Sequence, residues 1–258
     1  MSDSPVTWDD AADGVLRVTL ARPPANALGP PLIEGLDAAL DAAAARGTRV
    51  LVLTSAIPGF FVAGADIKHL GAVDAASFTA YGDRLRAVVE RLAAADLVSI
   101  AAIEGVALGG GLELAMAATM RVAGADARCG LPEARLGLIP GAGGTQRLPR
   151  LVGRGRAIDI MATARQVPAA EAAAIGLVDR LVEAGAACDA ALELAGTLAA
   201  SSRPALAAVV RTVDAASDRP LAEGLRYEVA QIQELFEHGE ATEGITAFLE
   251  KRPPEFAR

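Results

Sequence analysis

The chain has 258 residues, 52% of them hydrophobic and 22% charged, with a formal net charge of −8. This composition predicts a globular protein with a large apolar core and excludes intrinsic disorder. An acidic chain repels phosphate backbones, so we expect no nucleic-acid partner. The longest uncharged stretch, residues 50–65, contains Pro58-Gly59 and is too short for a membrane-spanning helix, so no membrane association is expected.

The first ten residues, MSDSPVTWDD, contain acidic but no basic side chains, so no secretory or transit signal is expected. Cys129 and Cys188 are far apart and have no metal-ligand spacing, which is typical of reduced thiols. The many alanines and arginines indicate a bacterial coding bias. We therefore expect a cytoplasmic, bacterial protein.

The first half of the chain alternates short strand patterns with helical ones. Residues 6–8 and 16–20 predict a hairpin, and Pro30-Pro31 begins a helix with apolar residues at helical spacing. Residues 50–53 and 98–103 are apolar, β-branched runs typical of buried strands, with an amphipathic helix over 78–92 between them. Weaker strand patterns follow at 121–123 and 177–182. This order predicts an α/β core.

The last sixty residues are predicted to be mostly helical. Helix starts are indicated at Ser202-Arg203-Pro204 and Arg219-Pro220, and Gly239 is a plausible stop. An apolar stripe at helical spacing runs from Leu221 to Phe236, which must be buried against the chain's own core or a neighbouring subunit. We therefore divide the chain into a core, residues 1–200, and a C-terminal helical region, residues 201–258.

Three glycine-containing segments have the composition of a functional site. The first, FFVAGADIKHL at 60–70, contains Gly64 between small residues, where a ligand can approach the backbone, and Asp66 can cap a helix that starts at Ile67. A simple strand-to-helix turn explains it equally well. The second, ALGGGLELA at 107–115, is typical of a strand end followed by a helix whose free N–H groups suit an oxyanion. Glu113 in its first turn either complements the helix dipole or acts in an apolar pocket.

The third segment, GLPEARLGLIPGAGGTQRL at 130–148, places Glu133 after a proline and before Gly141-Ala142-Gly143-Gly144. Taken alone, the position of Glu133 is explained by a carboxylate at the start of a helix. Neither glycine run matches a dinucleotide-binding or P-loop pattern, so a nucleotide site of those kinds is discounted.

Taken together and in order, these segments resemble those of the enoyl-CoA hydratase/isomerase (crotonase) superfamily. The resemblance extends over nearly the whole chain, including TARQVPAAEAAAIGLVDRLV at 163–182 and FLEKRPPEF at 248–256. It implies a crotonase-like spiral of ββα units followed by a helical trimerisation region, and a homotrimer or a homohexamer built as a dimer of trimers.

The resemblance also implies site residues. The oxyanion-hole amides would be those of Ala65 and Gly110, and the catalytic glutamates would be Glu113 and Glu133. The helix bearing Phe78, Tyr81 and Leu85 would border the acyl tail. The acyl-CoA substrate would lie along Ala63, Ala65, Asp66, Ile67 and Lys68, with Phe248 and Lys251 holding its nucleotide end, often from a neighbouring subunit. Thr119, Val98 and Leu131 depart from residues common in the family, and Leu131 is expected to alter the hydrogen bonding of Glu133.

Hydration of a 2-enoyl thioester suits these residues. Two N–H donors stabilise the enolate oxygen, and two buried carboxylates divide the proton transfers to and from water and the α-carbon. No metal or redox cofactor is required, since CoA is part of the substrate. The alternatives are a Δ3,Δ2-enoyl-CoA isomerase, which needs only one carboxylate, and a non-catalytic acyl-CoA- or RNA-binding relative. Retention of both glutamates favours hydration.

Overall fold

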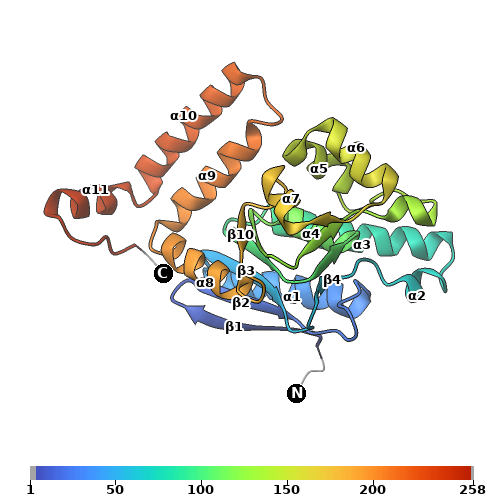
Figure 1. Ribbon diagram of the computed structural model, residues 1–258. Coiled ribbons are helices and arrows are strands. Elements are labelled where there is room, and N and C mark those ends of the chain that lie inside the picture. The colour runs from blue at the N-terminus through green and yellow to red at the C-terminus, as the bar shows by residue number, and fades with distance from the viewer. Residues whose placement is uncertain (1–3, 257–258) are drawn as a thin grey trace.

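Two stacked β-sheets surrounded by helices form the body of the protein (Figure 1). The structure, a computed structural model, describes residues 4–256. The strands are β1 (Val6–Ala12), β2 (Val15–Leu20), β3 (Val50–Ser55), β4 (Phe60–Val62), β5 (Val98–Ile103), β6 (Val106–Leu108), β7 (Met120–Gly124), β8 (Arg128–Gly130), β9 (Val167–Pro168) and β10 (Arg180–Val182). The helices are α1 (Pro30–Ala45), α2 (Ile67–Leu70), α3 (Ala75–Ala93), α4 (Gly110–Ala117), the 3-10 helix η1 (Glu133–Leu136), α5 (Gly144–Val152), α6 (Arg154–Thr163), α7 (Ala169–Ala174), α8 (Ala187–Ala199), α9 (Arg203–Ala215), α10 (Leu221–His238) and α11 (Ala241–Glu250).

The larger sheet has the strand order β1-β2-β3-β5-β7-β10, and the smaller has the order β4-β6-β8-β9. All pairings are parallel except the β1–β2 hairpin and the β8–β9 pair. Each of β3, β5 and β7 is followed directly by a strand of the smaller sheet, and then by a helix. This threefold repetition confirms the predicted spiral of ββα units.

The repetition positions the site. Because β4, β6 and β8 are parallel neighbours, the loops that leave their carboxyl ends meet at one edge of the smaller sheet. Those loops are the three glycine-containing segments that the sequence singled out. Residues 50–53 and 98–103 are buried throughout, as their unbroken apolar runs predict. One face of the larger sheet packs on α8, and the opposite face packs on α1, α3 and α4.

Two elements differ from their predicted extent. The first strand is predicted over 6–8 but continues to Ala12, because the cross-strand pair of Asp9 and Arg17 extends the ladder and Gly14, at φ +71°, closes a short turn. The strand predicted over 177–182 is confined to Arg180–Val182, since Leu177 and Val178 are buried ahead of it in the turn after α7.

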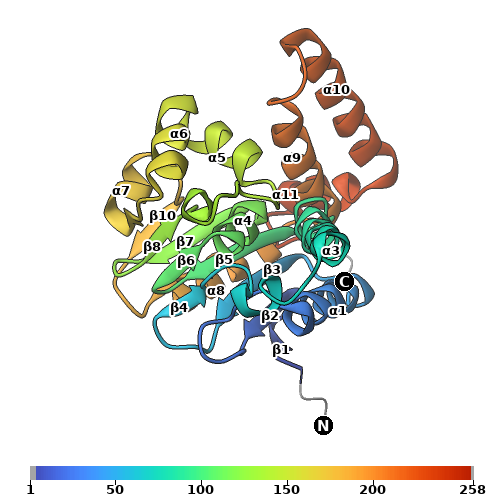
Figure 2. The same ribbon diagram turned by 90° about the vertical axis from the view of Figure 1, so that its right-hand side faces the viewer.

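The C-terminal helices lie to one side, and the α9–α10 hairpin projects from the core (Figures 1 and 2). Helix α9 packs through Ala207 and Ala208, whereas no residue of α10 is buried. The stripe of Leu221, Leu225, Val229, Ile232 and Phe236 is 52–79% exposed. Of the two expected coverings, the chain's own core does not bury it, and burial against a neighbouring subunit stays a prediction. The stripe faces away because α9 already contacts the core and α10 packs back on α9. Within residues 4–256, every helix is too short or too polar to span a bilayer.

Candidate active site

The loops after β4 and β6 cross at close range. Gly64 has φ +110°, and a Cβ atom there would lie 3.0 Å from the carbonyl oxygen of Leu108, so a side chain at this position would be strained and crowded. The Leu28 N–H donates to the Gly64 carbonyl at 2.8 Å, which ties the first loop to the segment before α1. The backbone around Ala65 is therefore held from both sides.

The Ala65 and Gly110 amides lie in adjacent segments. Gly110 is the first residue of α4, where backbone N–H groups have no acceptor within the helix. A Cβ atom built on Gly110 would lie 3.9 Å from the Ala65 nitrogen, so the two backbones nearly touch. This is the arrangement expected of two donors that share one oxyanion.

Glu113 is fixed by the third loop. Its side chain is 2% exposed, and Oε1 accepts the N–H groups of Ala142 and Gly144 at 2.7 and 2.8 Å. Burial raises the pKa of Glu113, while these two amides and the nearby Arg147 guanidinium act in the opposite direction. Glu113 is therefore a buried carboxylate and not a solvated surface group.

Glu133 has different surroundings. Burial, together with the charge of Glu113, raises the pKa of Glu133 to about 7. Its Oε2 atom is buried with no hydrogen-bond partner within residues 4–256. Leu131 is fully buried and offers no polar group, as its departure from the family pattern implies. Two carboxylates in one cavity therefore differ in how strongly each favours ionisation.

The residues Ala65, Gly110, Glu113 and Glu133 line a single cavity of about 270 Å³. The Tyr81 hydroxyl donates to the Leu28 carbonyl at 2.6 Å, which anchors α3 beside the cavity. The rest of the wall is mainly apolar, and its larger members are Ile67, Leu70, Phe78, Leu85, Leu136, Leu138 and Ile139. The cavity thus combines an apolar tail region with a few convergent polar groups, as substrate pockets do.

The segment 63–68 runs along the same edge. Asp66 caps α2 by accepting the His69 N–H at 3.2 Å, as predicted, and it also pairs with Arg22 at 2.7 Å. The Arg22 guanidinium lowers the pKa of Asp66. Ile67 contributes to the cavity wall, whereas Ala63 and Lys68 lie outside the set of cavity-lining residues. Ala63 is tied through its N–H to the Ala25 carbonyl at 3.0 Å.

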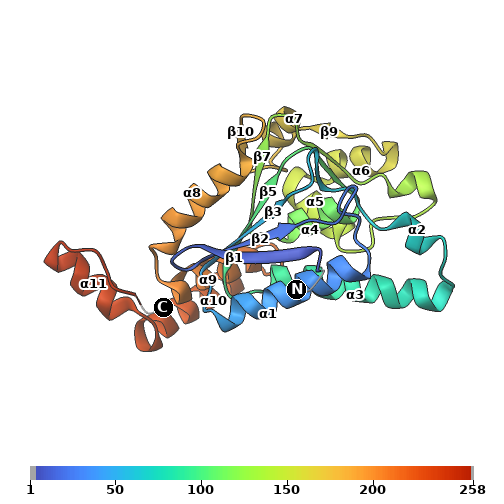
Figure 3. The ribbon, with the colours of Figure 1, turned by 90° about the horizontal axis from the view of Figure 1, so that it is seen from below.

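Phe248 and Lys251 are not near this cavity in the monomer. Phe248 lies on α11 and is 82% exposed, and Lys251 ends that helix with φ +55°. Helices α2 and α11 lie at opposite ends of the molecule (Figures 1 and 3). The two residues could reach a ligand along residues 63–68 only from a second copy of the chain.

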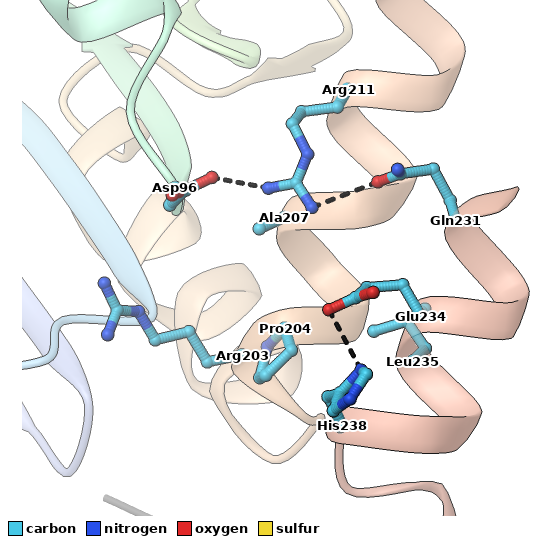
Figure 4. Close-up of a pocket in the computed structure, with 10 residues that line it drawn as sticks. Asp96, Arg203, Pro204, Ala207, Arg211, Gln231, Glu234, Leu235 and His238 are labelled. Carbon is cyan, nitrogen blue, oxygen red and sulfur yellow. Dashed lines mark hydrogen bonds and ion pairs between the residues drawn. The ribbon is translucent and has the colours of Figure 1, made fainter. Parts of the chain in front are cut away.

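A second cavity, of about 330 Å³, lies between α9 and α10 (Figure 4). Its charged groups largely bind each other. Arg211 pairs with Asp96 and donates to Gln231, and His238 lies 3.3 Å from Glu234. These contacts connect α9 to α10 and connect α9 to the core. Within residues 4–256, no cluster of three or more His, Cys, Asp or Glu side chains is arranged to hold a metal ion.

The sequence did not indicate that Ala142 and Gly144 hold Glu113. The available signal was the glycine run at 141–144, which exposes amides by the same logic as the run at 109–111. Exposed amides were expected only after the glycine run at 109–111. Arg22, Arg86 and Arg147 also contact the loops of the site and were missed. The contacts of Arg22 and Arg86 join segments distant in sequence, whereas Arg147 binds Ala142 only five residues away.

Comparison with known proteins is consistent with this geometry. The enoyl-CoA hydratase/isomerase family model matches residues 10–258. A probable enoyl-CoA hydratase of Rhizobium meliloti is 42% identical, with 93% of each chain covered, and the human mitochondrial methylglutaconyl-CoA hydratase is 38% identical over 90% of this chain and 70% of its own length. The crystal structure of an enoyl-CoA hydratase from Bacillus anthracis superposes with a TM-score of 0.93, at 35% identity and 98% coverage of each chain.

The family match spans nearly the whole chain, and the fold, with its three ββα units, is that of the matched structure. The chain belongs to the enoyl-CoA hydratase/isomerase family.

Proposed function

We propose that the protein is an enoyl-CoA hydratase, which adds water reversibly and syn to a 2-trans-enoyl-CoA to give the 3-hydroxyacyl-CoA. The observation that carries this proposal is the pair of unlike carboxylates in one cavity with two adjacent backbone amides. Relatives at 37–42% identity that bear hydratase names support the same reaction class, a hydro-lyase.

The amides of Ala65 and Gly110 bind the thioester oxygen and stabilise the negative charge that develops there. A single donor of this kind is typically worth about 3 to 4 kcal/mol of transition-state stabilisation. Because both donors belong to the backbone, they are in position before the substrate binds, and no side chain needs to reorganise.

Glu113 activates the water, and Glu133 delivers the proton to the α-carbon. Two amides favour the ionised form of Glu113, so it is the carboxylate available to accept a proton. Glu133 has a pKa of about 7, so a large fraction of it carries a proton near neutral pH and can donate that proton. In the reverse reaction the roles exchange, and both carboxylates share in holding the water.

The substrate is an acyl-CoA thioester whose CoA part follows residues 63–68. Phe248 and Lys251 of a neighbouring subunit hold its nucleotide end, in a homotrimer or a homohexamer. The exposed stripe on α10 supports such an assembly, since an apolar face of this size is otherwise unfavourable in water. No metal or redox cofactor is needed. A cytoplasmic location in a bacterium fits the composition and the bacterial relatives.

A spectrophotometric assay with crotonyl-CoA tests the proposal directly. Loss of the conjugated thioester absorbance, with formation of 3-hydroxybutyryl-CoA, is the expected result. If the protein instead converts a 3-enoyl-CoA to the 2-enoyl isomer without hydrating it, the isomerase alternative is correct. If it binds either thioester without converting it, the protein is a non-catalytic acyl-CoA-binding relative.

A further inference from the structure

The loop that holds Glu113 is bound by two arginines, and one of them, Arg86, also lines the cavity. The Arg86 Nη1 atom, on α3, donates to the Gly141 carbonyl at 3.0 Å. The Arg147 Nη1 atom, on α5, donates to the Ala142 carbonyl at 3.2 Å, and its Nη2 atom binds Glu90 of α3 at 2.9 Å. These bonds connect the loop to α3 and α5.

The direction of the peptide units explains why this matters. In a planar trans peptide the C=O and the following N–H point in opposite directions. The Gly141 carbonyl is held by Arg86, so the N–H of Ala142 in the same unit must point the other way, toward Glu113, which it reaches at 2.7 Å. One peptide unit therefore connects the guanidinium to the carboxylate.

The second donor is held by backbone N–H groups at the start of α5, and the Arg147 guanidinium binds the peptide unit between the two donors. The Gly143 carbonyl accepts the N–H groups of Gln146 and Arg147 at 3.0 and 2.8 Å, and the Gly144 N–H of that unit reaches Glu113 at 2.8 Å. A Cβ atom on Gly143 would lie 2.1 Å from Arg147 Nη1, so the absence of a side chain there lets the guanidinium cover the loop. Both peptide units that bind Glu113 are fixed at their carbonyl ends.

We propose that Arg86 and Arg147 are positioning residues for Glu113, which fix the 141–144 loop with carbonyls outward and amides toward the carboxylate. The inference rests on the proposed function, in which Glu113 is the base. Neither arginine touches the reacting atoms in this scheme. Arg86 is half-exposed and also pairs with Asp83, so its contribution is smaller than that of Arg147, which is 19% exposed.

The charged groups around Glu113 determine how the loss of each arginine changes the protonation of Glu113. Arg147 on α5 and Glu133 on η1 interact with it electrostatically, and so does Tyr81 on α3, whose pKa is raised to about 12 by burial, leaving it uncharged. Loss of Arg86 weakens an amide donor. Loss of Arg147 also removes the guanidinium charge that lowers the pKa of Glu113. Both changes favour the protonated form of Glu113, so the acid limb of the pH–rate profile moves to higher pH.

The test compares Arg86→Gln and Arg147→Gln with Arg84→Gln and Arg150→Gln, which remove exposed arginines from the same two helices. We expect the acid limb of kcat/KM for crotonyl-CoA to rise by roughly half a pH unit in Arg86→Gln and by roughly one unit in Arg147→Gln. The plateau kcat should fall roughly three- to tenfold with KM nearly unchanged. Arg86→Lys, which keeps one donor for Gly141, should recover part of the loss. The two controls should follow the unmodified protein.

Hydrogen exchange of the 141–144 amides provides a readout that needs no activity, and exchange there should be faster in both variants. The proposal is wrong if neither the acid limb nor the exchange changes, or if the variants only melt earlier with the wild-type profile. The proposal is also wrong for Arg86 if Arg86→Gln only raises the KM for acyl chains that end in a carboxylate. That result would mean that Arg86 contacts the acyl tail. An inactive unmodified protein would refute the proposed hydratase, and the exchange measurement would still decide whether the arginines hold the loop.

Discussion

Glu113 and Glu133 have the same side chain, but they differ in how readily they ionise because their neighbours differ. Glu113 accepts two backbone N–H groups, whereas Glu133 has a buried oxygen without a partner among the described residues. Desolvation raises the pKa of both. At Glu113 it is offset by two loop amides and Arg147, whereas at Glu133 it is offset only by that residue's own backbone N–H and is reinforced by the charge of Glu113.

The first prediction concerns this pair. Glu113→Gln and Glu133→Gln keep the side-chain shape and remove proton exchange, so each should reduce crotonyl-CoA hydration by roughly 100-fold or more. The double variant should be far less impaired than the product of the two losses, because the pair acts as a unit. Isothermal titration with a non-reactive acyl-CoA should show little change in affinity. Isomerisation of a 3-enoyl-CoA without hydration of crotonyl-CoA, kept in Glu113→Gln and abolished in Glu133→Gln, would instead indicate the isomerase.

The second prediction follows from the raised pKa of Glu133. Below its ordinary pKa of 4.5 the side chain is neutral in both the folded and the unfolded chain. Between 4.5 and about 7 the unfolded state ionises first, so this group lowers the free energy of unfolding as the pH rises. Glu133→Gln should therefore gain stability relative to the unmodified protein with rising pH, reaching about 1 to 2 kcal/mol above pH 7 after allowance for partial solvent screening.

Urea unfolding at pH 4.5 and pH 8 measures this difference. Glu193→Gln, an exposed carboxylate on α8, is the matched control and should show no such pH-dependent gap. A gap of the same size at both pH values would mean that burial does not shift the pKa of Glu133.

At the scale of elements, the site depends on where strands end and helices begin. Gly110 is the first residue of α4, a position where proline is well accommodated because its missing N–H has no acceptor within the helix. The nearest atom to a Cβ at Gly110 is Leu28 Cδ1, at 2.9 Å, the end of a buried side chain that has to shift by a few tenths of an ångström in any variant with a Cβ there. Gly110→Pro should therefore keep the helix while it removes the amide.

We expect Gly110→Pro to lose at least about a hundredfold in kcat, with Gly110→Ala as the control that adds the same Cβ and keeps the N–H. Circular dichroism and thermal melting should show that both variants remain folded. Near-normal turnover by a folded Gly110→Pro protein would mean that the thioester oxygen binds elsewhere.

At the scale of the whole molecule, two features of the single chain favour the proposed assembly. The α10 stripe is exposed, and Phe248 and Lys251 lie at the end of the molecule opposite α2. A single arrangement accounts for both, in which the C-terminal helices of one chain pack on another copy and bring α11 toward that copy's CoA region. Assembly and CoA binding are then coupled.

The fourth prediction tests this coupling. Ile232→Asp places a charge in the stripe and should convert the oligomer to monomers, because burying an unpaired carboxylate costs several kcal/mol. Light scattering measures the mass, and the KM for crotonyl-CoA should rise in the monomer as it does in Phe248→Ala. Glu228→Gln, an exposed polar position on the same helix, should change neither. A stable monomer formed by the unmodified protein at micromolar concentration would contradict the assembly.

The sequence by itself determined the elements and the composition of the site. Apolar runs at 50–53 and 98–103, the glycine-rich turns, and the caps at Asp66 and Ser202 are local signals, which act over a few residues whatever the rest of the chain does. Their order predicted an α/β core, and the ββα spiral was implied by the family resemblance. The three glycine-containing segments line one cavity, although each segment taken alone was also explained by a turn or a helix start.

Only the tertiary structure decided how the two glutamates differ in their tendency to ionise. Burial raises the pKa of Glu133 to about 7. The amides that hold Glu113 belong to a loop some thirty residues later in the chain. The bond between Arg86 and Gly141 and the exposure of the α10 stripe likewise depend on contacts between distant segments. Periodicity shows which face of a helix is apolar, but what covers that face is decided by packing, which no local pattern contains.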